Sequence, residues 1–289
     1  MNRPLLRARI HVMAAVSAMV ILAFILASCS PAGPGRAPEP TGQSPQASIT
    51  ATITIAGSTS VQPLSERLAE AFMSKHKDIK INVQGGGSTA GITAARTGTA
   101  QIGSSSRELK PDEKGLHEVL IAKDGIAIIV NSKNPIQDLK FDDVKAIFSG
   151  KVKDWNQVGG KPGPITVVIR ESGSGTRGAF EEMVMKGEPF EPKAVVQNST
   201  GAVRSTVAGD PNAIGFVSLA GLGEGVKAVK IDGIEPTAQN VVNGTYKINR
   251  PFLYLTKSAP EGAVKQFIDF ALSAEGQEIV AKEHLVRVK

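Results

Sequence analysis

Three short segments rich in glycine, serine and threonine each follow a β-branched run and precede a helical pattern. They are residues 56–60 (AGSTS), 85–91 (GGGSTAG) and 170–178 (RESGSGTRG). The first turn of a helix leaves backbone N–H groups unpaired, glycines allow close approach, and hydroxyls add further donors. Each segment alone is typical of an ordinary helix cap. Three together, with arginines inside the third and Arg107 after another serine run, predict a cradle for an anion.

The elements that must position these turns can be outlined from residue 50 onward. Short β-branched runs alternate there with helical patterns, which predicts βα units and a largely parallel sheet. Helices are expected at residues 60–75 and 264–281, where apolar residues recur on one face. The expected strands are residues 52–56, 80–84, 126–131, 165–170, 214–217 and 251–256.

The N-terminal segment is typical of a secretory signal. Three arginines precede an apolar run at residues 12–27, which is shorter than the roughly 20 residues that span a bilayer as a helix. The run ends in Leu26-Ala27-Ser28-Cys29, and a cysteine at this place matches the bacterial lipobox. We therefore expect residues 1–28 to be removed and Cys29 to carry a lipid. The alternative is an uncleaved signal anchor with an incidental cysteine.

The amino-acid composition indicates the class of protein. Hydrophobic residues make up 41% and charged residues 21% of the 289 residues, which fits a soluble protein with one large or two ordinary domains. Residues 29–49 contain five prolines and are predicted to form a tether. Three of the 33 basic residues and no acidic residue lie in residues 1–28, so the net charge of +6 falls to +3. With only 4% aromatic residues, base stacking on nucleic acid is not expected.

Motifs for catalysis are missing or incomplete. Gly173-x-Gly175-x-x-Gly178 matches the dinucleotide fingerprint, but a proline-broken loop stands where that fingerprint needs an acidic residue. Neither GxxxxGK[ST] nor GxSxG occurs, and each histidine after residue 28 stands among lysines or glutamates. The single cysteine rules out a disulfide framework or a CxxC motif. We expect no catalytic residues, metal site or cofactor, and hence not an enzyme.

These residues resemble the phosphate-binding protein of bacterial phosphate ABC transporters, the PstS family of type II periplasmic binding proteins. The likeness is carried by the three turns and by Ser105-Ser106-Arg107, and it extends over nearly the whole mature chain. It implies an α/β fold of two lobes joined by two crossover strands around a central cleft. Lobe one is expected at residues 50–131 plus 247–289 and lobe two at residues 132–246.

The resemblance also assigns a binding site. Carried over residue by residue, the phosphate ligands fall on Ser58, Thr59, Ser60, Ser88, Ser106, Arg170, Ser174, Gly175 and Thr176. Arg170 is expected to pair with the anion through its fork of donors. Some family members carry an aspartate where Ser106 stands, and that aspartate accepts the proton of phosphate and excludes sulfate. Here Ser106, Glu171 or Asp124 would have to accept it; we expect hydroxyl acceptors to suffice and phosphate to be preferred.

The resemblance and the lipobox together imply a lipoprotein, acylated (palmitate included) at Cys29, on the outer face of the bacterial cytoplasmic membrane. Where an outer membrane exists, this location is periplasmic. The protein would act as a monomer that delivers phosphate to permease subunits driven by a separate ATPase, without a nucleic acid partner. The alternatives are the same fold binding sulfate, molybdate or tungstate, a secreted phosphatase or dinucleotide-dependent oxidoreductase, and a structural surface lipoprotein.

Overall fold

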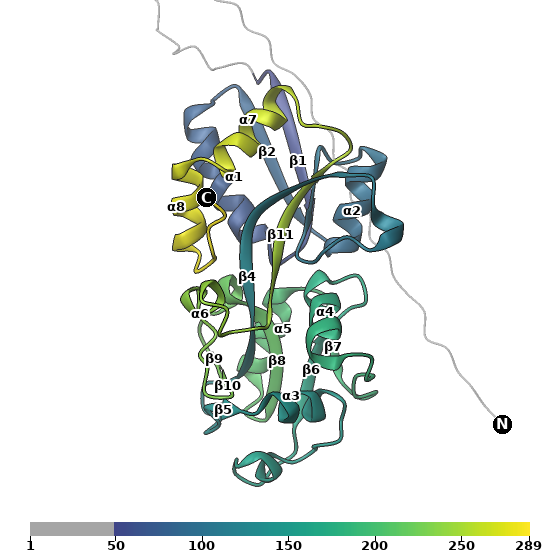
Figure 1. Ribbon diagram of the computed structural model, residues 1–289, viewed down its shortest axis with the longest axis vertical. Coiled ribbons are helices and arrows are strands. Elements are labelled where there is room, and N and C mark those ends of the chain that lie inside the picture. Colours follow the sequence, from purple (N-terminus) through teal and green to yellow (C-terminus); the bar gives the residue numbers. More distant parts are fainter. Residues whose placement is uncertain (1–48) are drawn as a thin grey trace, which may run out of the picture. The chain divides into compact units, whose positions relative to one another are not determined.

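A computed structural model describes residues 49–289 as two α/β lobes linked by two long strands (Figure 1). The expected signal peptide at residues 1–28, Cys29 and nearly all of the tether at 29–49 lie outside the described residues. Within residues 49–289, every helix is too short or too polar to span a bilayer.

The first lobe contains strands in the order β2-β1-β3-β11-β4 with helices on both faces. Its elements are β1 (Ala51–Gly57), α1 (Gln62–Lys75), β2 (Ile79–Gly85), α2 (Ser88–Thr97), β3 (Ile102–Ser105), a 3-10 turn (Pro111–Glu113), the first half of β4 (His117–Asn131), β11 (Asn249–Thr256), α7 (Gly262–Ala271) and α8 (Ala274–Lys282). Helices α1, α7 and α8 bury one face of this sheet around Ile55, Phe72 and Phe267. Helix α2 packs on the other face through Ile92 and Ala95.

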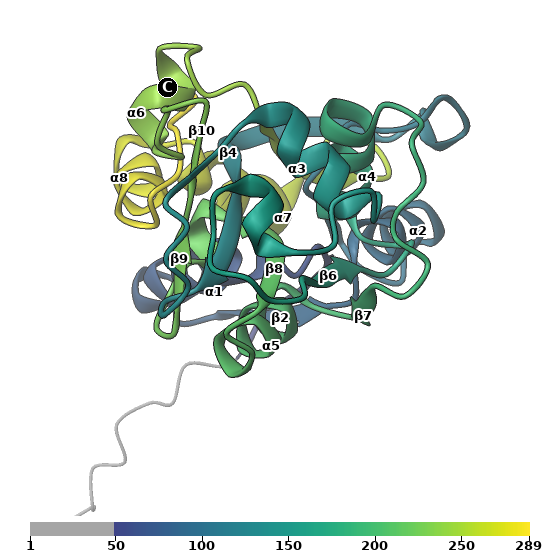
Figure 2. The same ribbon diagram turned by 90° about the horizontal axis from the view of Figure 1, so that it is seen from below.

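The second lobe continues the same sheet in the order β4-β8-β6-β7, with β9 also paired to β4. Its elements are β5 (Asp138–Leu139), α3 (Phe141–Phe148), a 3-10 turn (Trp155–Val158), β6 (Thr166–Arg170), α4 (Gly175–Phe180), a π-helical turn (Glu181–Met185), β7 (Val195–Gln197), α5 (Thr200–Gly209), β8 (Ala213–Ser218), a 3-10 turn (Leu219–Gly221), β9 (Val226–Ala228), β10 (Lys230–Ile231) and α6 (Ala238–Val242). Figure 2 shows α3 and α4 on one face of β6 and β8 and α5 on the other.

The second half of β4 is apolar throughout because helices cover both faces of the sheet here. Ile126, Ile128 and Val130 face the core formed with α3 and α4. Ala127 and Ile129 point the other way and pack with α5. A strand buried on both faces therefore reads as a continuous apolar run in the sequence.

The sheet is mixed, whereas the sequence predicts a largely parallel one. β1 is parallel to β2 and β3, and β6 is parallel to β7 and β8. β4 and β11 are antiparallel to each other and to their neighbours β8 and β3. The reason is that β4 and β11 carry the chain from one lobe to the other and back, so they run in opposite directions side by side (Figure 1).

The sequence predicts one helix at residues 264–281, and this prediction was wrong because the segment forms two helices, α7 and α8. The Oγ of Ser273 accepts a hydrogen bond from the N–H of Gly276 at 3.2 Å and thereby caps α8. A serine that competes for backbone donors in this way ends one helix and starts the next.

The packing of β4 shifts the division between the lobes. β4 pairs with β11 up to Gly125 and with β8 from Ile126 onward. Residues 126–130, expected in lobe one, lie in the core of lobe two, and Ile248 lies there as well. We therefore propose boundaries at residues 125–126 and 248–249.

Close packing of α2 on the sheet depends on glycine. A Cβ added at Gly91 would lie 2.6 Å from the Ala56 carbonyl oxygen and 2.7 Å from both the Gly57 Cα and the Ser104 carbonyl oxygen. These neighbours are backbone atoms of β1 and β3, which cannot move as freely as a side chain. The missing side chain thus sets how closely the start of α2 approaches the ends of β1 and β3.

We expect Gly91→Ala to destabilise the protein by about 1–3 kcal/mol, because α2 must move off the sheet. The measurement is the midpoint of urea unfolding followed by circular dichroism. Gly201→Ala is the matched control: Gly201 lies in α5 with no atom within 4 Å of its added Cβ. That change should be neutral or stabilising by up to about 1 kcal/mol. Equal midpoints for the two variants would contradict the packing argument.

Candidate functional site

Hydroxyl groups from the two lobes meet directly in a buried cluster. Ser60 of lobe one has its Oγ 2.9 Å from both the Thr176 and the Thr200 Oγ1 of lobe two. Thr59 also reaches across, because its Oγ1 accepts from the backbone N–H of Thr200 at 3.2 Å. Ser60, Thr176 and Thr200 expose at most 7% of their surface, and Thr59 is half-buried. The first turn, at residues 56–60, therefore contacts lobe two as well as its own strand.

The other lobe-one hydroxyls surround Ser106. Its Oγ accepts from the Ser58 Oγ at 2.9 Å and lies 3.4 Å from the Ser88 Oγ, and its N–H donates to the Ser88 Oγ at 3.0 Å. These residues follow β1, begin α2 and follow β3. Because the three strands are parallel neighbours, their carboxyl ends bring all three hydroxyls to one edge of the sheet.

The turn before α4 brings backbone from lobe two against these serines. A Cβ at Gly175 would lie 2.2 Å from the Ser88 Oγ and 2.7 Å from the Ser106 Oγ, so only glycine fits there. Ser174 differs from the other predicted ligands, because its hydroxyl oxygen accepts from the N–H of Arg177 at 3.2 Å and caps α4. The structure thus places Gly175 in the cluster and Ser174 directly beside it.

Arg170 ends β6 and points one nitrogen at the cluster. Its Nη1 donates to the Thr200 Oγ1 at 3.3 Å. Its Nε and Nη2 donate to the Oε2 and Oε1 of Glu171 at 2.9 and 2.8 Å. The Nε–H and one N–H of Nη2 therefore hold Glu171, and Nη1 is the nitrogen that contacts a cluster hydroxyl.

Two residues of the cluster were not predicted as ligands. Thr200 follows β7 and begins α5 in Ser199-Thr200-Gly201, so it repeats the pattern of the other turns and was detectable from the sequence. Arg250 lies on β11, and its Nη1 donates to the Ser106 Oγ at 3.2 Å. Arg250 lies in a strand rather than in a turn rich in glycine and hydroxyls, so the pattern that marked the other ligands does not include it.

Asp124 lies at the crossing of β4 and β11 and is completely buried. Its Oδ2 accepts from the Nε and Nη2 of Arg250 at 3.0 and 2.9 Å, and its Oδ1 accepts from the Ser218 Oγ and the Leu219 N–H at 2.8 and 3.1 Å. Burial raises the pKa of Asp124, and the Arg250 guanidinium and these hydrogen bonds oppose the rise. Both carboxylate oxygens of Asp124 are therefore occupied by these bonds, and neither is directed at the cluster.

The hydroxyls differ in whether they can accept a hydrogen bond from a protonated ligand. The Ser106 oxygen already accepts from Ser58 and Arg250, which fills both of its lone pairs. The hydroxyls of Ser60 and Thr176 bond to each other in a pair whose direction can reverse. An acceptor role thus fits Ser60 and Thr176 better than Ser106, Glu171 or Asp124.

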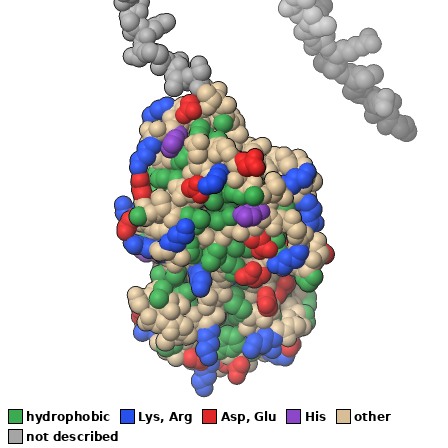
Figure 3. Space-filling view, turned by 45° about the horizontal axis from the view of Figure 1, so that its top comes forward, with side chains coloured by type: hydrophobic (Ala, Val, Ile, Leu, Met, Phe, Trp, Pro, Cys, Tyr) green, Lys and Arg blue, Asp and Glu red, His purple; other side chains and the backbone are tan. Residues whose placement is uncertain are grey.

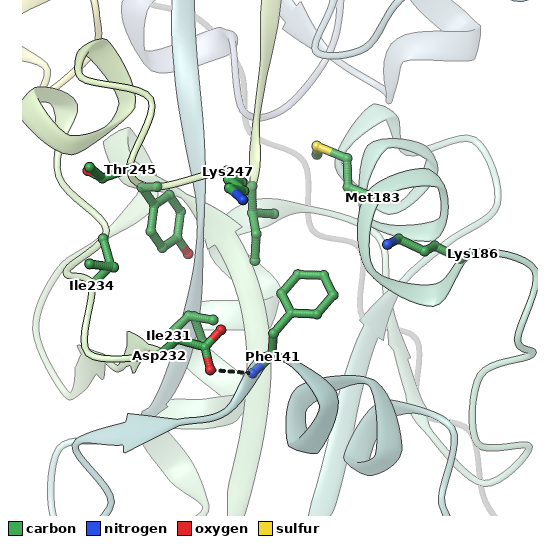
Figure 4. A pocket seen from close by; sticks show the side chains of 10 residues that line it. Phe141, Met183, Lys186, Ile231, Asp232, Ile234, Thr245 and Lys247 are labelled. Carbon is green, nitrogen blue, oxygen red and sulfur yellow. Dashed lines mark hydrogen bonds between the residues drawn. The ribbon is translucent and has the colours of Figure 1, made fainter.

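A cavity of about 630 Å³ lies elsewhere, in lobe two (Figure 4). The Asp232 carboxylate there accepts from the Phe141 N–H at 3.2 Å, and the Lys186 Nζ lies 5.6 Å from the centre of the Phe141 ring. Its lining is otherwise mainly apolar and includes none of the predicted ligands. The cavity is therefore separate from the hydroxyl cluster.

The surface seen in Figure 3 mixes basic and acidic side chains rather than separating them by sign. Within the described chain, no three His, Cys, Asp or Glu residues gather as metal ligands would. The concentration of donors in the buried cluster is the feature of residues 49–289 that suits an anion.

Comparison with known proteins identifies the family of the chain. A family model described as a PBP superfamily domain matches residues 42–275. The phosphate-binding protein PstS of Bacillus subtilis is 34% identical over 271 residues, covering 92% of this chain and 90% of that protein. The chain belongs to the PstS family.

Solved structures of PstS-type proteins share the fold. A substrate-binding protein of Clostridium perfringens, solved with bound phosphate, is 48% identical with a TM-score of 0.80, covering 82% of this chain and 100% of that one. A phosphate transport receptor of Vibrio cholerae is 36% identical with a TM-score of 0.67, covering 81% of this chain and 99% of that one. The two-lobe fold expected from the sequence is thus confirmed.

We expect Thr200→Val to weaken contact between the lobes in protein freed of bound anions. The change removes the side-chain bonds from Thr200 to Thr59 and Ser60 but keeps the shape of the side chain. Small-angle scattering should show a larger radius of gyration than for the wild type. Thr206→Val is the control, because Thr206 lies on the same helix and its Oγ1 accepts from Gln197 within lobe two. Identical scattering from the Thr200 and Thr206 variants would contradict this role of Thr200.

Proposed function

We propose that this protein captures inorganic phosphate and delivers it, as a lipid-anchored monomer, to the permease of an ABC transporter driven by a separate ATPase. Its ligands would be the hydroxyls and amides of Ser58, Thr59, Ser60, Ser88, Ser106, Ser174, Gly175 and Thr176 with the Nη1 of Arg170, joined by Thr200. The proposal also places the protein on the outer face of the cytoplasmic membrane.

The observation that carries the proposal is the meeting of hydroxyls from both lobes with a guanidinium nitrogen in one buried place. Phosphate offers four oxygens in a compact tetrahedron, and short hydrogen bonds from hydroxyls, amides and guanidinium match it. The relatives support the choice of anion, since the Bacillus subtilis protein is named for phosphate and the Clostridium perfringens structure holds it.

The proposal assigns the protein no catalytic step. A phosphatase would need a nucleophile with a base or a metal to activate water. The serines of the cluster bond to other hydroxyls, to backbone groups and to Arg250, and none of these hydrogen-bond partners is a histidine or a carboxylate that would take a proton. The cluster therefore suits binding and release of an intact anion.

We expect Arg170→Gln to weaken phosphate binding at least about 100-fold, because it removes a charged donor from a buried site. Isothermal titration calorimetry on the purified protein, freed of bound anions, measures the loss. Arg204→Gln removes the same charge elsewhere in lobe two, where Arg204 donates to the Gly221 carbonyl, and should bind like the wild type. A wild type that binds no phosphate would refute the proposed function.

The same titration with sulfate tests the choice of anion. We expect weaker binding of sulfate than of phosphate at pH 7, since Ser60 and Thr176 can accept a hydrogen bond from the P–O–H group that phosphate carries and sulfate lacks. Equal affinities would overturn the assignment of phosphate and leave the fold unaffected.

We expect Cys29→Ser to move the protein from the membrane fraction to the soluble fraction of cells, because Cys29 is the only cysteine available for a lipid. Ultracentrifugation of lysates followed by immunoblotting measures the distribution. Ser30→Ala, beside the proposed lipid site, is the control and should stay with the membrane. Membrane retention of the Cys29 variant would contradict lipid anchoring at this residue.

A further inference from the structure

Arg170 and Arg250 are arranged in the same way around the cluster. Both are buried, with 2% and 3% of their surface exposed. Each directs Nε and Nη2 at one carboxylate, Glu171 for Arg170 and Asp124 for Arg250. Each directs Nη1 at a cluster hydroxyl, Thr200 and Ser106 respectively. Arg250 thus repeats, from β11, the geometry of the residue that the family resemblance assigns to the anion.

The two Nη1 atoms contact hydroxyls that belong to one connected group of residues. The Ser106 Oγ, which accepts from Arg250, accepts also from the Ser58 Oγ at 2.9 Å. The Ser58 Oγ accepts from the Ser60 N–H at 3.2 Å. From Arg250 to Arg170, the contacts run through Ser106, Ser58, the backbone N–H and then the side-chain hydroxyl of Ser60, and Thr200. Both guanidinium groups therefore act on the same small set of hydroxyls.

Electrostatics favours an anion bonded to both groups. Burial lowers the pKa of Arg250, Asp124 opposes this, and the positive charge of Arg170 lowers the pKa further. The two cations are therefore close enough to repel each other, although each is neutralised by its own carboxylate. An anion that accepts from both Nη1 atoms relieves that repulsion and gains two charge-assisted hydrogen bonds.

We propose that Arg250 is a direct ligand of the bound phosphate through its Nη1, opposite Arg170, and that Asp124 is the positioning residue that holds it. This inference rests on the proposed function. Arg170 belongs to lobe two and Arg250 to the strand that returns to lobe one, so an anion bonded to both joins the two lobes. Ser106, whose oxygen accepts from Arg250, donates its own hydrogen toward the ligand.

The test is phosphate titration of the purified full chain carrying Asp124→Asn together with Arg250→Gln. Removing Arg250 alone would strand a buried carboxylate and unfold part of the protein, whereas the double change replaces the ion pair by a neutral hydrogen-bonded pair. Calorimetry should show binding about 10- to 100-fold weaker than in the wild type, because one charged donor is lost. Thermal unfolding of the same sample verifies that it is folded.

A second buried ion pair provides the matched control. The sequence grouped Arg107 with the expected anion cradle, but the structure directs its guanidinium elsewhere. Its Nη1 and Nη2 donate to the two carboxylate oxygens of Glu113 at 2.6 and 2.7 Å, and Nη2 also donates to the Thr89 Oγ1 at 3.3 Å rather than to a cluster hydroxyl. Arg107→Gln with Glu113→Gln should keep the affinity of the wild type. Equal losses in the two double variants would show a general effect of removing a buried pair and would overturn the proposal.

A crystal structure of the wild type grown with inorganic phosphate separates a ligand from a merely structural residue. We expect the Arg250 Nη1 at 2.7–3.2 Å from a phosphate oxygen. A phosphate held by Arg170 with Arg250 beyond hydrogen-bond reach would overturn the proposal, whatever the variants do.

Loss of binding in Arg170→Gln with unchanged binding in the Asp124/Arg250 variant would overturn the role of Arg250 and leave the proposed function standing. A wild type without affinity for phosphate would overturn both.

Discussion

A buried ion pair at the place where the chain crosses between the lobes is the interaction on which the rest of the structure depends. Asp124 of β4 and Arg250 of β11 lie opposite each other in the register of the two strands, and both are buried. Removing one partner of such a pair costs about 3–5 kcal/mol, because the other charge is left uncompensated. Asp124 also accepts from Ser218 and Leu219 at the start of the turn after β8, so the pair ties both crossing strands to lobe two.

Pairing of each buried arginine with a carboxylate explains how a site with little net charge can bind an anion. Glu171 and Asp124 neutralise the two arginines and at the same time orient them, which leaves one N–H-bearing nitrogen of each facing the hydroxyls. Recognition then depends on the number and direction of donors rather than on excess positive charge. The mixed surface charges in Figure 3 agree with this view, because the visible face has no broad basic area to attract anions unselectively.

Contact between the lobes is made in part by neutral hydroxyl groups. The bonds from Ser60 to Thr176 and Thr200 join residues more than 100 positions apart, and they involve only neutral hydroxyls. Such bonds contribute little net free energy individually, about 1 kcal/mol each, so the lobes can separate and meet again at low cost. The two crossing strands are the natural place for that motion, since they are the segments that connect the cores of the two lobes.

The sequence by itself determined the features that depend on neighbours along the chain. Turns of glycine, serine and threonine between a strand and a helix are local, and the turns at Ser58, Ser88 and Gly175 lie where their motifs predict them. Apolar periodicity likewise revealed α1 and most core strands, whereas β3, with its Gly-Ser-Ser sequence, and the half of β4 that contains Lys123 and Asp124 do not show it.

Only the tertiary structure decided which groups meet. Arg250 and Ser106 are 144 positions apart, and no local pattern records that β11 returns beside β4 and brings this guanidinium to the cluster. The same holds for Glu171. From the sequence, its carboxylate was one candidate acceptor for the ligand, whereas in the folded protein it accepts hydrogen bonds from Arg170. Backbone propensities act over a few residues, but a buried hydrogen-bonding site is chosen by the packing of whole strands and lobes.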